Sequence, residues 1–244
     1  MCVVAAKWFD KIGWVLAKNR DRNYMPTIHF RKSNRDDVER LYIWDDNTRY
    51  TEGLNEHGVC IVSASLMTKD DEKEHTKGED TRDYYSPDGK KIRTALLERD
   101  VKSALKKVLE LKLSGHTLVA DQHHCYLLEA VKIGEEGYDW DVQPVKQGES
   151  ITRTNHGINL PHAGYQRVEE DENQTASRIC SEARYLLARR MVEEATSPLD
   201  LVDKLTYHET ENPQLNPCRL DSRPSQLKTT GQLMLVPSRR TLYY

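Results

Sequence analysis

Strand-like and helix-like segments follow one another in blocks along this chain of 244 residues, and this order constrains its fold most strongly. Short apolar runs fill the first quarter and return in the middle and at the end, while helical patterns are confined to 91–113 and 173–205. Strands that follow one another directly pair as antiparallel hairpins, whereas a parallel, Rossmann-type sheet needs a helix between successive strands. The order therefore predicts an α+β fold, in which two antiparallel sheets between helix layers would bury every apolar face.

The expected strands are short apolar runs bounded by turn residues. They are Val3–Lys7, Gly13–Asn19, Ile28–Arg31, Leu41–Trp44, Val59–Leu66, Thr117–Ala120, Cys125–Val131, Tyr138–Val145, Ser150–Asn155, Gln232–Val236 and Thr241–Tyr244. Turns are expected at 9–13, 53–58, 121–124 and 237–238, where residues that favour turns gather.

Two regions carry the 3.6-residue period of helices. In Lys91–Leu113 the apolar residues recur at helical spacing, with one break expected near Asp100. The pattern in Asn173–Ala195 is clearer. Its apolar stripe consists of Ile179, Ala183, Leu186, Leu187 and Met191. We expect that stripe to face the core, with Arg and Glu residues opposite. Ser197 is a natural N-cap for a shorter helix through Leu205.

One segment between the expected strands and helices is rich in charged residues. Residues 68–90 begin with the run TKDDEKEHTKGEDTRD, which has no apolar period. We expect a solvated loop there, with a flap over a site as the less favoured alternative. The rest of the chain shows no composition shift that would separate domains, and its length suits one domain spanning 1–244.

Composition narrows the class of partner. The formal net charge of −3 gives no basic footprint for nucleic acid or for an anionic membrane surface. No apolar run reaches membrane-spanning length, and the N-terminus lacks a signal-peptide pattern. The five cysteines are an odd number at irregular spacings, which is untypical of a disulfide framework and favours a reducing, cytoplasmic setting. The partner we expect is a small molecule, and a homo-oligomer stays open.

A zinc site is one interpretation of the adjacent residues His123, His124 and Cys125, because histidine and cysteine are common zinc ligands. Adjacent side chains of a hairpin point to opposite faces, and no second ligand pair stands at finger-like spacing. We therefore expect no metal and no cofactor. Cys60, Cys125 and Cys180 lie among apolar residues and are expected to be small core residues.

Cys2 stands directly behind the initiator Met1, and this position allows an unusual chemistry. A thiol is a strong nucleophile only as its thiolate, so a catalytic cysteine needs a base nearby. Removal of Met1 would give Cys2 a free α-amine, whose ordinary pKa of about 7.7–8.0 suits a general base near neutral pH. If Val3–Lys7 pairs with Gly13–Asn19, Asp21 falls beside the start of the first strand, where a carboxylate could orient that amine.

Four segments in one order carry a family resemblance. They are Met1-Cys2 with the hairpin into Asn19-Arg20-Asp21, the GLNEHGV turn that starts at Gly53, Thr154-Asn155-His156, and Pro217-Cys218-Arg219 with the closing hairpin. This series resembles the N-terminal nucleophile hydrolases of the choloylglycine hydrolase and penicillin V acylase type, and the isopenicillin N acyltransferase-like enzymes. The resemblance implies a four-layer αββα sandwich of two antiparallel sheets flanked by helices.

The resemblance also implies roles for residues. Cys2 would be nucleophile and base, Asp21 would orient the amine, and Asn155 would donate to the oxyanion. The backbone N–H near Ser65 would be the second donor. His156 would be structural support.

Three basic residues complete the set. The family's arginine three positions before the aspartate is Lys18 here, which keeps the charge and loses the bidentate fork, while an arginine stands at Arg20. Arg219 would contact a substrate carboxylate or close a salt bridge.

The resemblance favours a hydrolase or acyltransferase that acts on a peptide or non-peptide C–N amide bond through an acyl-thioester on Cys2. Its substrate would be a small-molecule amide or acyl donor. Two alternatives stay open. One is a non-catalytic binding or scaffold member of the same fold. The replacement of the family's arginine by Lys18 is compatible with this alternative. The other is a dipeptidase of the related secernin-type group, whose G-K-N-S-D-R segment is similar to the string from Lys18 to Arg22.

Overall fold

The computed structural model describes residues 2–66, 87–134, 137–220 and 227–244. The charged segment 68–90 lies outside the described residues up to 86. Its last four residues, 87–90, are the first turn of a helix and not part of a loop. No helix in the described ranges is long and apolar enough to cross a membrane.

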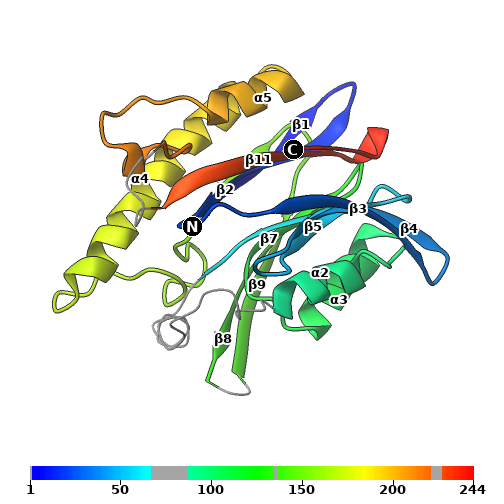
Figure 1. Ribbon diagram of the computed structural model, residues 1–244, viewed down its shortest axis with the longest axis horizontal. Coiled ribbons are helices and arrows are strands. Elements are labelled where there is room, and N and C mark those ends of the chain that lie inside the picture. Colours follow the sequence, from blue (N-terminus) through cyan, green and yellow to red (C-terminus); the bar gives the residue numbers. More distant parts are fainter. Residues whose placement is uncertain (1, 67–86, 135–136, 221–226) are drawn as a thin grey trace.

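Two antiparallel sheets form the centre of the molecule (Figure 1). The first has five strands in the order β10-β1-β2-β11-β12, with bounds β1 Cys2–Phe9, β2 Gly13–Arg22, β10 Ser150–Arg153, β11 Lys228–Val236 and β12 Thr241–Tyr243. The second has seven strands in sequence order from β3 to β9. Their bounds are β3 Ile28–Arg35, β4 Val38–Asp45, β5 Thr51–Asn55, β6 Cys60–Ala64, β7 Gly115–Ala120, β8 Cys125–Ile133 and β9 Gly137–Val145.

Helices cover the outer face of each sheet. Figure 1 shows α4 (Glu172–Glu194) and α5 (Pro198–Leu205) over the five-stranded sheet, and α2 (Pro87–Ala95) and α3 (Val101–Glu110) over the seven-stranded one. Two short 3-10 helices, η2 (Pro213–Leu215) and η3 (Pro237–Arg239), complete the described elements.

Three apolar cores separate the layers, and their members follow the alternation of the strands. Between the sheets, Val4 of β1 belongs to one buried cluster with Val62 and Leu118 of β6 and β7. Its neighbour Val3 points the other way and belongs to the cluster of α4 and α5. A third cluster joins the seven-stranded sheet to α2 and α3. The resulting layer order, helix–sheet–sheet–helix, confirms the expected α+β, αββα architecture.

The local signals in the sequence are confirmed at several boundaries. The helical pattern of 91–113 breaks at Asp100, whose side chain accepts from the backbone N–H groups of Lys102 and Ser103 and so caps α3. Ser197 caps α5 in the same way. The hairpin closed by 121–124 joins β7 and β8 as expected.

The buried face of α4 differs from the expected apolar stripe. Ile179 and Leu186 are 48% and 63% exposed, whereas Ser181 and Arg184 are fully buried. The reason is that this stretch of the helix binds polar groups. Ser181 forms hydrogen bonds with residues 154–156, just after β10, and Arg184 forms an ion pair with Asp21 of β2. Only its C-terminal part, from Ala188 through Met191 and Val192, buries apolar side chains.

Two further expectations need correction. Gly53 belongs to strand β5 and not to a turn, and a Cβ on it would lie 2.2 Å from the carbonyl oxygen of Leu41 on β4. Glycine at this position therefore allows a close approach of two strands rather than a turn. Cys180 is only partly buried, while Cys60 and Cys125 lie in the core as expected.

Candidate active site around Cys2

The β1–β2 hairpin places Cys2 directly opposite Arg20, and this register decides which side chains share its face. Side chains alternate along a strand, so Lys18, Arg20 and Arg22 point with Cys2 toward the seven-stranded sheet. Asp21 points to the opposite face, toward α4. The site around the thiol is therefore built from alternate residues of β2.

Two buried carboxylates of the seven-stranded sheet balance two of these cations. Lys18 Nζ lies 2.6 Å from Oε1 of Glu52 and donates to the Ser63 carbonyl at 2.5 Å. Arg20 lies 3.3 Å from Asp45 and 3.5 Å from Glu52. All four charged side chains are at most 1% exposed. The pairs thus join the two sheets by ionic contacts that solvent does not screen.

Arg22 donates a hydrogen bond to the thiol. Its Nη1 donates to Cys2 Sγ at 3.6 Å and to the backbone carbonyl of Asp21 at 2.7 Å. The nearest carboxylate oxygen, on Asp45, is 3.9 Å from Arg22 Nε and already accepts from Arg20 and from Tyr24. Among the described residues, Cys2 is therefore the closest anionic partner that Arg22 has.

The pKa of the Cys2 thiol moves in the direction that favours a nucleophile. Burial raises this pKa, but the positive charges of Lys18, of the N-terminal ammonium group and of Arg22, in that order, act against burial and bring it from its ordinary 9.0 to about 6. Burial raises the pKa of Cys60 and of Cys125 well above the ordinary value. At neutral pH the structure therefore favours the thiolate at Cys2 and the neutral thiol at these two core cysteines.

Asn155 holds the backbone of Cys2. Its Oδ1 accepts from Cys2 N at 2.8 Å, and its Nδ2 donates to the Ser65 carbonyl at 2.7 Å. Its own backbone N–H donates to Ser181 Oγ of α4 at 2.9 Å, which fixes the residue from the helix layer. An amide group carries two hydrogens, so within the described chain one Nδ2 hydrogen stays available for another acceptor.

His156 follows Asn155 and is part of the support for this turn. Its Nδ1 lies 3.1 Å from Thr154 Oγ1 and 2.9 Å from Ser181 Oγ. Burial, reinforced by the charge of Arg178, lowers the pKa of His156 to about 4. The ring is therefore neutral at physiological pH.

Asp21 lies behind the sheet, in a second buried cluster. Its carboxylate forms an ion pair of 2.5 Å with Arg184 of α4, accepts from Thr229 Oγ1 at 2.7 Å and lies 3.9 Å from Arg219 Nε. No hydrogen bond joins Asp21 to Cys2 in the described part of the chain. Arg219 is fully buried and faces this carboxylate, which is the salt-bridge alternative of the two expected for it.

The structure thus divides the predicted site residues into two groups. Cys2 shares one face with Lys18 and Arg20, and its backbone N–H donates to Asn155, which itself donates to the Ser65 carbonyl. The other group, Asp21 and Arg219, lies on the far side of β2.

Sequence reasoning missed four charged residues of these clusters: Arg22, Asp45, Glu52 and Arg184. The alternation of basic residues at 18, 20 and 22 was a usable signal for Arg22, because such residues share one face of a strand. Asp45, Glu52 and Arg184 had no such signal, since they come from other elements.

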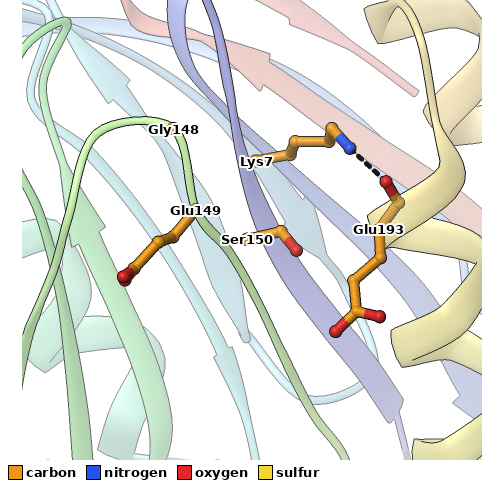
Figure 2. A pocket seen from close by; sticks show the side chains of 5 residues that line it. All are labelled: Lys7, Gly148, Glu149, Ser150 and Glu193. Atoms are coloured by element: carbon orange, nitrogen blue, oxygen red, sulfur yellow. Dashed lines mark hydrogen bonds between the residues drawn. The ribbon is translucent and has the colours of Figure 1, made fainter.

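A surface cavity lies elsewhere. Figure 2 shows the residues that line it: Lys7 of β1, Gly148 and Glu149 of the preceding loop, Ser150 of β10 and Glu193 of α4. The cavity has a volume of about 320 Å³. Lys7 donates there to the backbone carbonyl of Glu193 at 2.7 Å. Five residue-to-residue steps along an extended strand separate Lys7 from Cys2, which is roughly 16 Å. This cavity is therefore not the surroundings of the thiol.

Fold and site together define an αββα sandwich with a buried, cation-bound thiol at the start of its first strand. No protein-family model and no curated protein sequence matches the chain. Among solved structures, it is similar to the Caenorhabditis elegans ortholog of N-acylethanolamine-hydrolyzing acid amidase, with a TM-score of 0.44 and 11% identity over 98% of this chain and 93% of that one.

Proposed function

We propose that this chain is an N-terminal nucleophile hydrolase or acyltransferase that cleaves a C–N amide bond through an acyl-thioester on Cys2. The observation that carries the proposal is the placement of the thiol among cations, with Arg22 Nη1 at 3.6 Å from Sγ. The pKa of about 6 that the surrounding positive charges, with Lys18 first, give the buried thiol makes a thiolate available at neutral pH. A scaffold protein has no need of a thiolate in its core.

The α-amine of Cys2 supplies the proton transfers once Met1 is removed. Its ordinary pKa of about 7.7–8.0 lies above that of the thiol, so the resting pair is a thiolate and an ammonium group. The thiolate adds to the amide carbon, and the C=O electron pair moves to oxygen. When the C–N bond breaks, the ammonium group gives its proton to the leaving nitrogen, which departs as an amine.

The second half of the reaction releases the acyl group. The free α-amine takes a proton from water as the water oxygen adds to the thioester carbon. The C–S bond then breaks, and the thiolate returns with its electron pair. Amide and water give acid and amine, while a second amine in place of water gives acyl transfer.

Asn155 is the group that we propose for two tasks in this cycle. Its Oδ1, 2.8 Å from Cys2 N, orients the amine, which is the task that the family resemblance gave to Asp21. Its second Nδ2 hydrogen is the proposed donor to the oxyanion, and loss of one such donor typically costs about 100-fold or more in kcat. The backbone N–H near Ser65 stays the proposed second donor.

Alkylation with peptide mapping tests the proposal. Intact mass reports whether Met1 is removed, and brief treatment with iodoacetamide at pH 7 reports which cysteine reacts first. We expect Met1 to be absent and Cys2 to be labelled at least about tenfold faster than a thiol of ordinary pKa. Cys60→Ser is the matched control, because it removes a buried cysteine and should leave the fast label in place.

Two outcomes of the mass and labelling experiment would contradict the proposal. Retained Met1, or a Cys2 that reacts no faster than an ordinary thiol, would leave the non-catalytic scaffold as the better reading. If the fast label is found, a screen of amides with free and with blocked N-termini separates a dipeptidase from an enzyme that removes other acyl groups. Cys2→Ala should then abolish turnover while the circular dichroism spectrum is unchanged.

A further inference from the structure

The cluster around Cys2 holds more positive than negative side chains. Lys18, Arg20 and Arg22 face only two carboxylates among the residues that the structure describes, those of Asp45 and Glu52. Lys18 and Arg20 lie closest to these carboxylates. Arg22 shares Asp45 with Arg20 at the longer distance of 3.9 Å, and the Cys2 thiolate supplies the further negative charge beside it.

Acylation of Cys2 removes that balance. A thioester sulfur is neutral, so when the acyl group is in place Arg22 keeps, within the described chain, only Asp45, which it shares with Arg20. Two guanidinium groups that share one carboxylate in a protected site are short of negative charge, and an anion brought by the acyl group would replace the thiolate. The site is thus more complementary to an acyl group with a negative charge than to a neutral one.

Arg22 is placed to meet such a group. Its side chain is 17% exposed, in contrast to Lys18 and Arg20, which are at most 1% exposed. Part of its side chain is therefore open to solvent, from which a substrate arrives. Its head group is a fork that matches a carboxylate. Asp45 is the carboxylate that opposes an incoming anion, and Arg20 and Tyr24 already donate to it.

We propose that Arg22 binds a carboxylate on the acyl group that Cys2 receives. The preferred substrates are then amides of dicarboxylic acids, with the second carboxylate close to the scissile carbonyl. This inference rests on the proposed function, because it assigns the substrate class of the same thiol.

Two alkylating reagents test the inference without a known substrate. Iodoacetamide is neutral, and iodoacetate carries a carboxylate beside the reacting carbon. In both, the thiolate forms the S–C bond and iodide leaves with the electron pair of the C–I bond. The quantity measured is the rate with iodoacetate divided by the rate with iodoacetamide, at Cys2 by peptide mapping and in glutathione as a free thiol. The fraction of thiolate cancels in this ratio.

We expect the ratio at Cys2 to exceed that of glutathione by about tenfold, the value of one charge-assisted hydrogen bond. Arg22→Gln should bring the ratio down to that of glutathione, and Arg22→Lys should keep part of the preference. Arg99→Gln is the matched control, because Arg99 is exposed in the turn between α2 and α3 and should leave the ratio unchanged.

The outcomes separate the two proposals. Fast labelling of Cys2 with a glutathione-like ratio would overturn the carboxylate specificity and leave the thiol nucleophile standing. A high ratio that persists in folded Arg22→Gln would also overturn it, since another cation would then bind the anion. Slow labelling of Cys2 by both reagents would overturn the proposed function and this inference together.

Discussion

The carboxylate of Asp21 and the guanidinium group of Arg184 form a fully buried ion pair of 2.5 Å that joins β2 to the middle of α4. These residues are 163 positions apart in the chain. The pair lies directly behind the strand that carries the cations of the candidate site. The pair therefore fixes α4 to the part of β2 that carries Lys18, Arg20 and Arg22.

Removal of one partner of this pair should destabilise the fold strongly. We expect Arg184→Met to lower the free energy of unfolding by about 3–5 kcal/mol, because Asp21 would stay buried with less compensation. Urea denaturation measures the change. The exposed pair of Arg190 and Glu209 is the control, and Arg190→Gln should cost less than about 1 kcal/mol. A similar loss of stability for both variants would contradict the conclusion that the buried pair of Asp21 and Arg184 is the more important of the two.

The cations beside the thiol should set its reactivity. Arg22→Gln and Lys18→Gln each remove a positive charge that lowers the pKa of Cys2, so each should raise that pKa from about 6 by about one unit or more. The pH profile of iodoacetamide labelling at Cys2 gives the midpoint directly. A midpoint that stays near 6 in both folded variants would show that neither charge acts on the thiol.

The same thiol should make stability depend on pH. Its pKa is lower in the folded state, about 6, than its ordinary 9.0, so deprotonation favours the folded state. The contribution is fully present above about pH 9, falls as the pH drops toward 6, and amounts to a few kcal/mol. Urea denaturation of the wild type and of Cys2→Ser at pH 6 and pH 9 isolates it. The wild type should gain stability relative to Cys2→Ser as the pH rises. An equal change in the free energy of unfolding for both proteins between pH 6 and pH 9 would show that the Cys2 thiol does not contribute.

His116 should contribute to loss of stability in acid. Burial lowers its pKa to about 3, and it lies 3.7 Å from Glu129 and 2.9 Å from the His156 carbonyl, with no exposed surface. The neutral ring is favoured in the fold, so stability is present above about pH 6.5 and falls below it by up to about 1.4 kcal/mol per pH unit. His116→Gln should flatten this slope in denaturation curves between pH 6.5 and 4. An unchanged slope would mean that other groups cause it.

Part of the candidate site follows from sequence alone. Cys2 and the basic residues at 18, 20 and 22 belong to one hairpin, and alternation along a strand puts the three basic side chains on one face. The same alternation places Asp21 on the other face. The expectation that the Asp21 carboxylate would orient the amine of Cys2 considered only how far along the strand Asp21 lies. It did not consider the face of the sheet toward which its side chain points.

The sequence by itself determined the hairpins, the break at Asp100, the cap at Ser197 and the separation of strands from helices. These features depend on residues close together in the chain, whose propensities and spacing can be read directly. The tertiary structure alone decided that Glu52 and Asp45 neutralise the cations of β2, and that α4 buries Arg184 in place of Leu186. Those choices depend on contacts between layers, where a buried charge must find a partner from a distant segment, and no local pattern records which segment that is.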